Sequence, residues 1–216
     1  MFKLFQKINL PNLPSALVNT ALRTGIDNCL NLKTRQQITG YNGKLNLGYC
    51  PTLTTVTKIP HVDPSKGLYV RNDASDDIKK FIHDVIPEEF NIENRNIGIH
   101  TIINDFKPNV SKNTNKLIYR LNKNSVDMTW FKEIGKDLIR DDRGQATEEL
   151  DKLIKVTSGT LHINNWYLLT TNVYHGIINN DSDEFIVDLV INLNTWQAFQ
   201  LAAEFGEVPM IVNSTS

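Results

Sequence analysis

Cysteine is almost absent from this chain of 216 residues, in which Cys29 and Cys50 are the only two. Two cysteines are too few for a disulfide framework or for a metal site built from thiolates, so a reducing compartment is expected. The sequence also lacks an apolar run long enough to span a bilayer, and its first residues lack the hydrophobic block and cleavage site of a secretory leader. We therefore expect a cytoplasmic protein that makes no membrane contact.

An excess of basic charge is missing as well. The chain has 23 Lys and Arg against 24 Asp and Glu, a formal net charge of −1. Because phosphate binding usually shows itself as a basic excess, we expect no nucleic-acid partner and look instead for a small-molecule or peptide substrate. Glycine-rich phosphate loops and the Gly-x-Ser-x-Gly elbow of hydrolases are absent too, so the sequence offers no support for either class.

Three segments have the apolar spacing and the end signals of helices. They cover residues 15–23, 73–87 and 194–206. The candidate N-cap residues are Ser15, Ser75, and either Asn194 or Thr195, while Pro87 and Gly206 end the last two segments as stop signals. A composition of 40% hydrophobic residues over this length fits one globular domain, residues 1–216.

The rest of the chain has the residue pattern of strands. Alternation or apolar runs mark residues 96–103, 116–122 and 126–134, and residues 160–192 predict two or three strands around an Asn-Asp-Ser-Asp turn. Residues 36–70 suit short strands, residues 104–115 a polar loop, and residues 133–156 either helix or strand. This order predicts a mainly β protein with a jelly-roll core over 97–193, on which residues 1–90 pack and which helix 194–206 follows.

Histidine is the best source of candidate site residues. His100 and His175 form the better pair, because each is expected to end a strand and to precede a polar loop. Residues far apart in sequence converge at one end of a β sandwich, so the two imidazoles can meet at a metal. With Asp105 as the nearest carboxylate they would form a facial triad that binds iron. The alternative is that both are structural and hydrogen-bonded.

The other histidines offer weaker alternatives. His61 and Asp63 form a His-x-Asp pair that could supply two metal ligands, and His162 could join His175 in a cupin-like metal site. His83 lies in the predicted helix 73–87, where a structural position at or near the surface is expected.

Several of these segments occur in an order that resembles a known family. They are Ile99-His100, Lys116-Leu-Ile-Tyr-Arg-Leu-Asn, Met128-Thr-Trp-Phe, and the strand, His175 and turn of residues 165–189. Together they look like the double-stranded β-helix of iron(II)- and 2-oxoglutarate-dependent oxygenases, most similar to the aspartyl/asparaginyl β-hydroxylase-like group and its small phage and marine relatives. The resemblance implies a cupin-like fold, dioxygenase (hydroxylase) activity, and iron held by His100 and His175, with Asp105 as a possible third ligand.

Two departures from that family pattern bear on function. Ile102 stands where the family usually has an acid two residues after the first histidine, and no arginine follows His175 at about ten residues. Lys116 or Arg120 could bind 2-oxoglutarate instead, since alternation puts both on one side of their strand. The alternative is a catalytically degenerate jelly-roll module with a binding or structural role, for instance in a virion. Asp188 alternates with apolar neighbours, as on an outer face.

Overall fold

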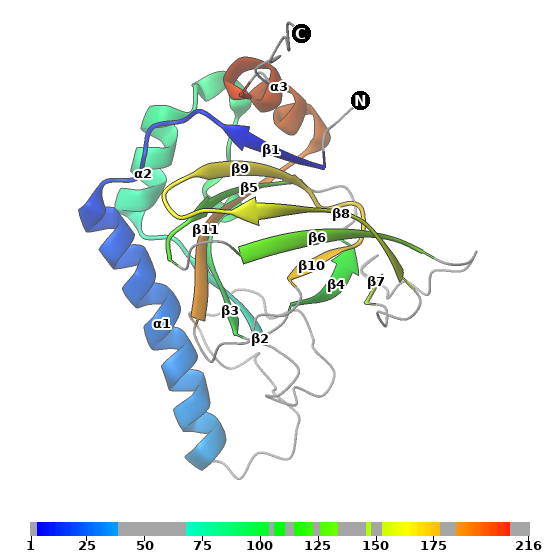
Figure 1. Cartoon of the computed structure of the whole chain (residues 1–216). Coiled ribbons are helices and arrows are strands. Elements are labelled where there is room, and N and C mark those ends of the chain that lie inside the picture. Colours follow the sequence, from blue (N-terminus) through cyan, green and yellow to red (C-terminus); the bar gives the residue numbers. More distant parts are fainter. Residues whose placement is uncertain are drawn as a thin grey trace, which may run out of the picture.

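The computed structural model describes residues 4–38, 68–103, 106–110, 115–122, 126–133, 146–147, 153–177 and 185–207. These residues form two antiparallel sheets that lie face to face, with helices against one of them (Figure 1). The first sheet contains, in spatial order, β1 (Phe5–Ile8), β9 (Trp166–Thr170), β5 (Asn115–Arg120), β11 (Phe185–Leu193), β3 (Ile97–Ile103) and β2 (Leu68–Asp73). The second contains β7 (Ala146–Thr147), β4 (Phe106–Val110), β10 (His175–Ile177), β6 (Val126–Glu133) and β8 (Leu153–Leu161).

The chain crosses repeatedly between the two sheets from β3 onward. β3, β5, β9 and β11 lie in the first sheet, and β4, β6, β8 and β10 lie in the second. This winding is that of a jelly roll, so the predicted fold class, a mainly β double-stranded β-helix with flanking helices, is confirmed.

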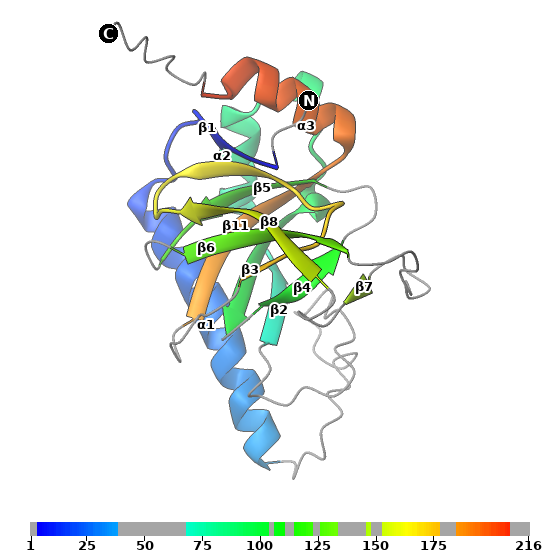
Figure 2. The same cartoon turned by 45° about the vertical axis from the view of Figure 1, so that its right-hand side comes forward.

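Each face of the first sheet has its own apolar core. Its inner face packs on the second sheet through side chains such as Ile118, Trp130 and Val190. Its outer face is covered by three helices, α1 (Ser15–Ile38), α2 (Asp76–Val85) and α3 (Thr195–Phe205), as Figure 2 shows from a second direction. Because both faces are buried, β3 and β11 are largely apolar, and any buried polar residue in them needs a partner.

Helix α1 lies close to β3 and β11 of the first sheet. A Cβ atom added at Gly25 would come within 2.7 Å of Thr101 on β3 and of Val187 on β11. The glycine therefore allows the close approach of the helix to the sheet.

The sequence predicted two of the helices well. Ser75 caps α2 through a hydrogen bond from the Ile78 amide, and Asn194 caps α3 in a capping box with Gln197. Helix α1 is longer than the predicted range 15–23, and Ser15 is its first residue. No helix in the described part of the chain is long and apolar enough to cross a membrane.

Several strand predictions need correction. Residues 104–115 were expected to be a loop, but β4 lies within them and pairs with β10 and β7. The segment contains Pro108, which the ladder tolerates because the β4–β10 register shifts between His175 and Ile177. Of the undecided range 133–156, the described residues belong to β6, β7 and β8; most of 36–70 lies outside the described residues.

Candidate ligand site between the sheets

Four adjacent strands carry a row of polar residues across the inner face of the first sheet. Arg71 on β2 lies opposite His100 on β3, His100 lies opposite Asp188 on β11, and Asp188 lies opposite Arg120 on β5. Residues directly opposite one another in a sheet project to the same face. The row therefore points toward the second sheet, where His175 opens β10 beside Trp130 and Asn109.

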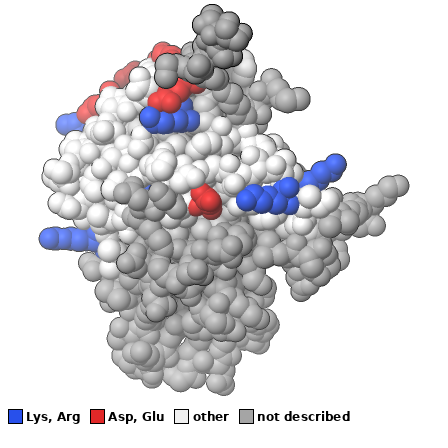
Figure 3. Space-filling view, in the orientation of Figure 1, with Lys and Arg blue, Asp and Glu red and all other residues white. Residues whose placement is uncertain are grey.

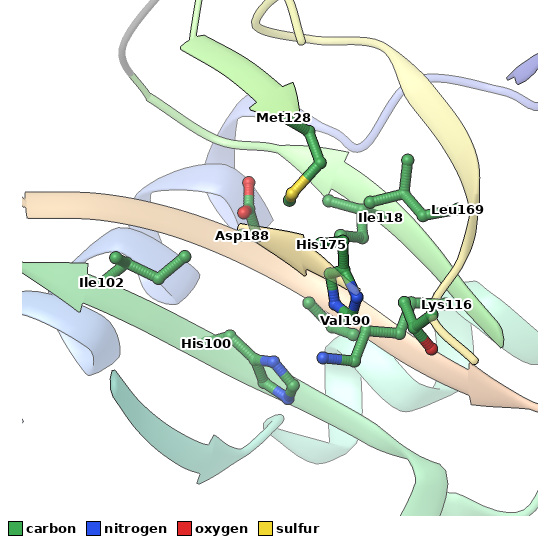
Figure 4. A pocket seen from close by; sticks show the side chains of 10 residues that line it. His100, Ile102, Lys116, Ile118, Met128, Leu169, His175, Asp188 and Val190 are labelled. Atoms are coloured by element: carbon green, nitrogen blue, oxygen red, sulfur yellow. The ribbon is translucent and has the colours of Figure 1, made fainter. Parts of the chain in front are cut away.

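A small cavity lies between the sheets at this row. It is lined by His100, Ile102, Lys116, Ile118, Met128, Leu169, Thr171, His175, Asp188 and Val190. Its volume is about 20 Å³, room for about one water-sized group. The structure thus brings His100, His175 and Lys116 to one place, and Figure 4 shows the Lys116 side chain extending toward the two imidazole rings.

Both imidazoles are neutral at ordinary pH. His100 and His175 are 4% and 1% exposed, and this burial is the largest cause that lowers their pKa values, followed by the positive charge of Lys116. The pKa of His175 falls to about 3, although its ring bond to the Val173 carbonyl oxygen, 2.9 Å long, acts in the other direction. Because a carbonyl oxygen can only accept, Nδ1 of His175 carries the proton and Nε2 keeps its lone pair.

Lys116 supplies the positive charge at the cavity. The pKa of its ammonium is lowered to about 8. Burial is the largest cause, the positive charge of the nearby Arg71 acts in the same direction, and Asp188 opposes both effects. Lys116 as a whole is partly buried, and it is one of the residues that line the cavity.

Arg120 and Asp188 form a buried ion pair beside the cavity. The Arg120 Nε donates to one carboxylate oxygen over 2.6 Å and Nη2 donates to the other over 3.3 Å, with side chains 0% and 3% exposed. Burial raises the pKa of Asp188, and the Arg120 charge lowers it. This explains why Asp188 does not lie on the outer face, as expected from the sequence, and why both its oxygens are already engaged.

The described donors do not fit an iron site. No three His, Cys, Asp or Glu side chains within the described ranges lie close enough together to hold a metal ion. Asp188, the carboxylate of the cavity, is bound to Arg120, and Lys116 places a positive charge near both imidazoles that would repel a divalent cation. Asp105, the expected third ligand, lies outside the described residues.

The described part of the structure does not place the remaining predicted site residues at the cavity. His61 and Asp63 lie outside the described residues, His162 is exposed and does not line the cavity, and His83 bonds to Asn94 near the surface. His100 was expected to end its strand but is the middle residue of β3, because that strand begins at Ile97 and ends at Ile103. His175 begins β10 rather than ending a strand.

Arg71 and Asp188 are the site residues that the sequence did not reveal. The position of Asp188 within the apolar run of β11 could have revealed it, because a charged residue in a strand that is buried on both faces requires a partner. Arg71 gave no such signal. Figure 3 shows charged side chains at several separate places on the visible described surface, whereas Lys116 lines the cavity between the sheets.

No family model and no curated protein matches the sequence. Among solved structures, the epimerase SnoN in complex with Fe3+, alpha ketoglutarate and nogalamycin RO matches 88% of this chain and 78% of its own, with a TM-score of 0.46 and 11% identity. AviO1 from Streptomyces viridochromogenes matches 87% and 90%, with a TM-score of 0.38 and 13% identity.

A seed protein is also similar. Vicilin from Corylus avellana (hazelnut) matches 59% of this chain, which spans only 28% of the vicilin chain, with a TM-score of 0.32 and 7% identity. These scores are too low to carry an argument about function. The jelly-roll assignment therefore rests on the strand order of the chain itself, and its function has to be argued from its cavity.

Proposed function

We propose that this chain is a jelly-roll binding module whose inter-sheet cavity takes the carboxylate group of a small molecule. The observation that carries the proposal is the positive charge of Lys116 at a cavity whose two imidazoles are neutral. An ammonium attracts a carboxylate strongly in an enclosed, largely apolar space, because the low dielectric strengthens the interaction of opposite charges.

The wider charge balance supports the same ligand class. Arg71, Lys116 and Arg120 project from the inner face of the first sheet, and Asp188 is the carboxylate that lines the cavity beside them. Two guanidinium nitrogens, Nε of Arg71 and Nη1 of Arg120, are buried without a hydrogen-bond partner in the described part of the structure. Neither arginine lines the cavity, so each adds positive charge to its surroundings rather than a contact to a ligand within it.

The size of the cavity limits the ligand. A volume of about 20 Å³, room for about one water-sized group, admits one carboxylate oxygen rather than a whole dicarboxylate. A larger acid such as 2-oxoglutarate would place one carboxylate at Lys116 and extend its remainder out of the cavity.

Titration with acetate and 2-oxoglutarate tests the proposal. We expect both to bind, and we expect Lys116→Met to weaken binding at least tenfold, about 1.4 kcal/mol or more, because it removes the counter-charge. Lys155→Met, a matched change at an exposed lysine on β8, should leave the affinity unchanged. Binding is measured by tryptophan fluorescence or calorimetry. Equal affinity in Lys116→Met, or equal binding of the neutral acetamide, would show that the cavity is not a carboxylate site.

Carboxylate binding should weaken as the pH rises through about 8. The reason is that Lys116, with a pKa of about 8, loses its proton there, and the affinity then falls about tenfold per pH unit. The titratable and charged groups that face Lys116 from the packed strands are Arg71, His100, Arg120, His175 and Asp188. The imidazoles stay neutral over pH 7–10, so they do not add to this transition. An affinity that is constant from pH 7 to 10 would contradict the assignment.

A second candidate is the iron(II)- and 2-oxoglutarate-dependent dioxygenase, of the aspartyl/asparaginyl β-hydroxylase-like kind. The observation that favours it is the placement of two neutral imidazoles, His100 and His175, at one cavity. Neutral imidazole is the form that binds metals. Its third ligand would have to come from Asp105 or another residue outside the described ranges.

A metal titration separates the two candidates. The dioxygenase requires Mn²⁺ or Fe²⁺ to bind in the presence of 2-oxoglutarate, binding to be lost in His100→Ala and in His175→Ala, and succinate to be released. The binding module requires carboxylate affinity that is the same with and without metal.

A further inference from the structure

We propose that the Lys116 amine forms an imine with a small carbonyl compound, an aldehyde or a 2-oxo acid, whose carbonyl group reaches the amine at the cavity. The inference rests on the proposed function only where the carbonyl compound also carries a carboxylate. It follows from where the amine lies and what surrounds it.

The walls around the amine favour its neutral, nucleophilic form. Apolar side chains make up most of the cavity lining, namely Ile102, Ile118, Met128, Leu169 and Val190. Arg71 adds a second positive charge from the neighbouring edge of the sheet. Lysine amines become nucleophiles when they are desolvated in an apolar pocket or lie next to another cation, and Lys116 combines both conditions.

The cavity also holds groups that can move the protons of the reaction. His100 on β3 and His175 on β10 line it from opposite sheets, and each interacts electrostatically with Lys116. Figure 4 shows both rings on the side of the cavity toward which Lys116 extends. A neutral imidazole accepts a proton and returns it as a general acid, so one ring can serve both steps.

The reaction balances without any further reagent. The nitrogen of Lys116 bonds to the carbonyl carbon, and an imidazole carries a proton from this nitrogen to the carbonyl oxygen, which becomes a hydroxyl. The imidazole then carries the second proton of the nitrogen to that hydroxyl, which leaves as water, and the C=N bond forms. Nothing is oxidised or reduced in these steps.

Reductive trapping tests the inference on the full, unmodified chain. The protein is treated at pH 7 with acetaldehyde or glyoxylate and sodium cyanoborohydride, and the adducts are located by peptide mass mapping. We expect Lys116 to be labelled at least tenfold faster than the exposed Lys132 and Lys155, which serve as internal controls. The preference should vanish in 8 M urea, where all lysines are in water. Labelling of Lys116 no faster than of Lys155 in the folded protein overturns the inference.

Two further results separate this inference from the carboxylate site. If acetate binds in a Lys116-dependent manner but neither carbonyl compound labels Lys116, the imine is wrong and the binding site stands. If acetaldehyde labels Lys116 selectively and acetate does not bind, the reactive amine stands and the carboxylate site is wrong. A role for the imidazoles is shown by slower labelling of Lys116 in His175→Gln, with labelling of Lys155 unchanged.

Discussion

Replacing Arg120 by methionine should lower the free energy of unfolding by about 3–5 kcal/mol. The substitution leaves the carboxylate of Asp188 buried at 2% exposure without its counter-charge, and it removes both charge-assisted hydrogen bonds of the pair. Urea denaturation at pH 7 measures the loss. It is the largest single effect expected in the protein because an uncompensated buried charge costs more than a lost apolar contact of similar size.

The double variant Arg120→Met with Asp188→Leu is the matched control. It removes both charges and replaces them by apolar groups of similar size, so it should recover most of the stability that the single change loses. A loss of less than about 1 kcal/mol in Arg120→Met, or no recovery in the double variant, would show that the ion pair does not stabilise the fold.

Acidification should destabilise the protein through its buried imidazoles. His175 has a pKa of about 3 in the folded state, against about 6.5 in an unfolded chain. Between these values the unfolded state binds more protons, so stability is complete above about pH 6.5 and falls as the pH drops toward 3. At pH 4.5 His175 alone should account for a loss of about 3 kcal/mol, and His100 acts in the same direction.

Urea denaturation at pH 7 and pH 4.5 checks this expectation. The variant His175→Gln should show a smaller loss between the two pH values than the unmodified protein, whatever its stability at pH 7. His162→Gln, a change at an exposed histidine, should keep the full loss. An unchanged pH dependence in His175→Gln would mean that this ring is charged or hydrated in the folded protein.

Local signals in the sequence were sufficient for much of the fold. Ser75 and Asn194 marked the starts of α2 and α3 because capping depends on a few adjacent residues. The apolar runs of β3 and β11 marked strands that are buried on both faces. Strand β4 was missed because the Lys-Pro-Asn at its centre has little strand propensity, and pairing with β10 and β7 decides its conformation.

The candidate site, like the fold, was predictable from the sequence only in part. Alternation correctly placed Lys116, Ile118 and Arg120 on one side of β5, but it could not say what they face. That depends on the register between strands distant in sequence, which puts Asp188 beside Arg120 and brings the Lys116 charge to both histidines. His100 and His175 were predicted to meet because both were expected to end strands. Both line the cavity, but His100 reaches it from the middle of β3.

The Arg120–Asp188 pair also specifies how the first sheet is assembled. Strand β11 lies between β5 and β3, and its apolar residues Val187 and Leu189 flank Asp188. Shifting β11 by one residue would turn Asp188 toward the helices and place an aliphatic side chain opposite Arg120, leaving two buried charges apart. A strand with so many interchangeable apolar residues would otherwise have several nearly equivalent alignments, and a single ionic pair rejects all but one.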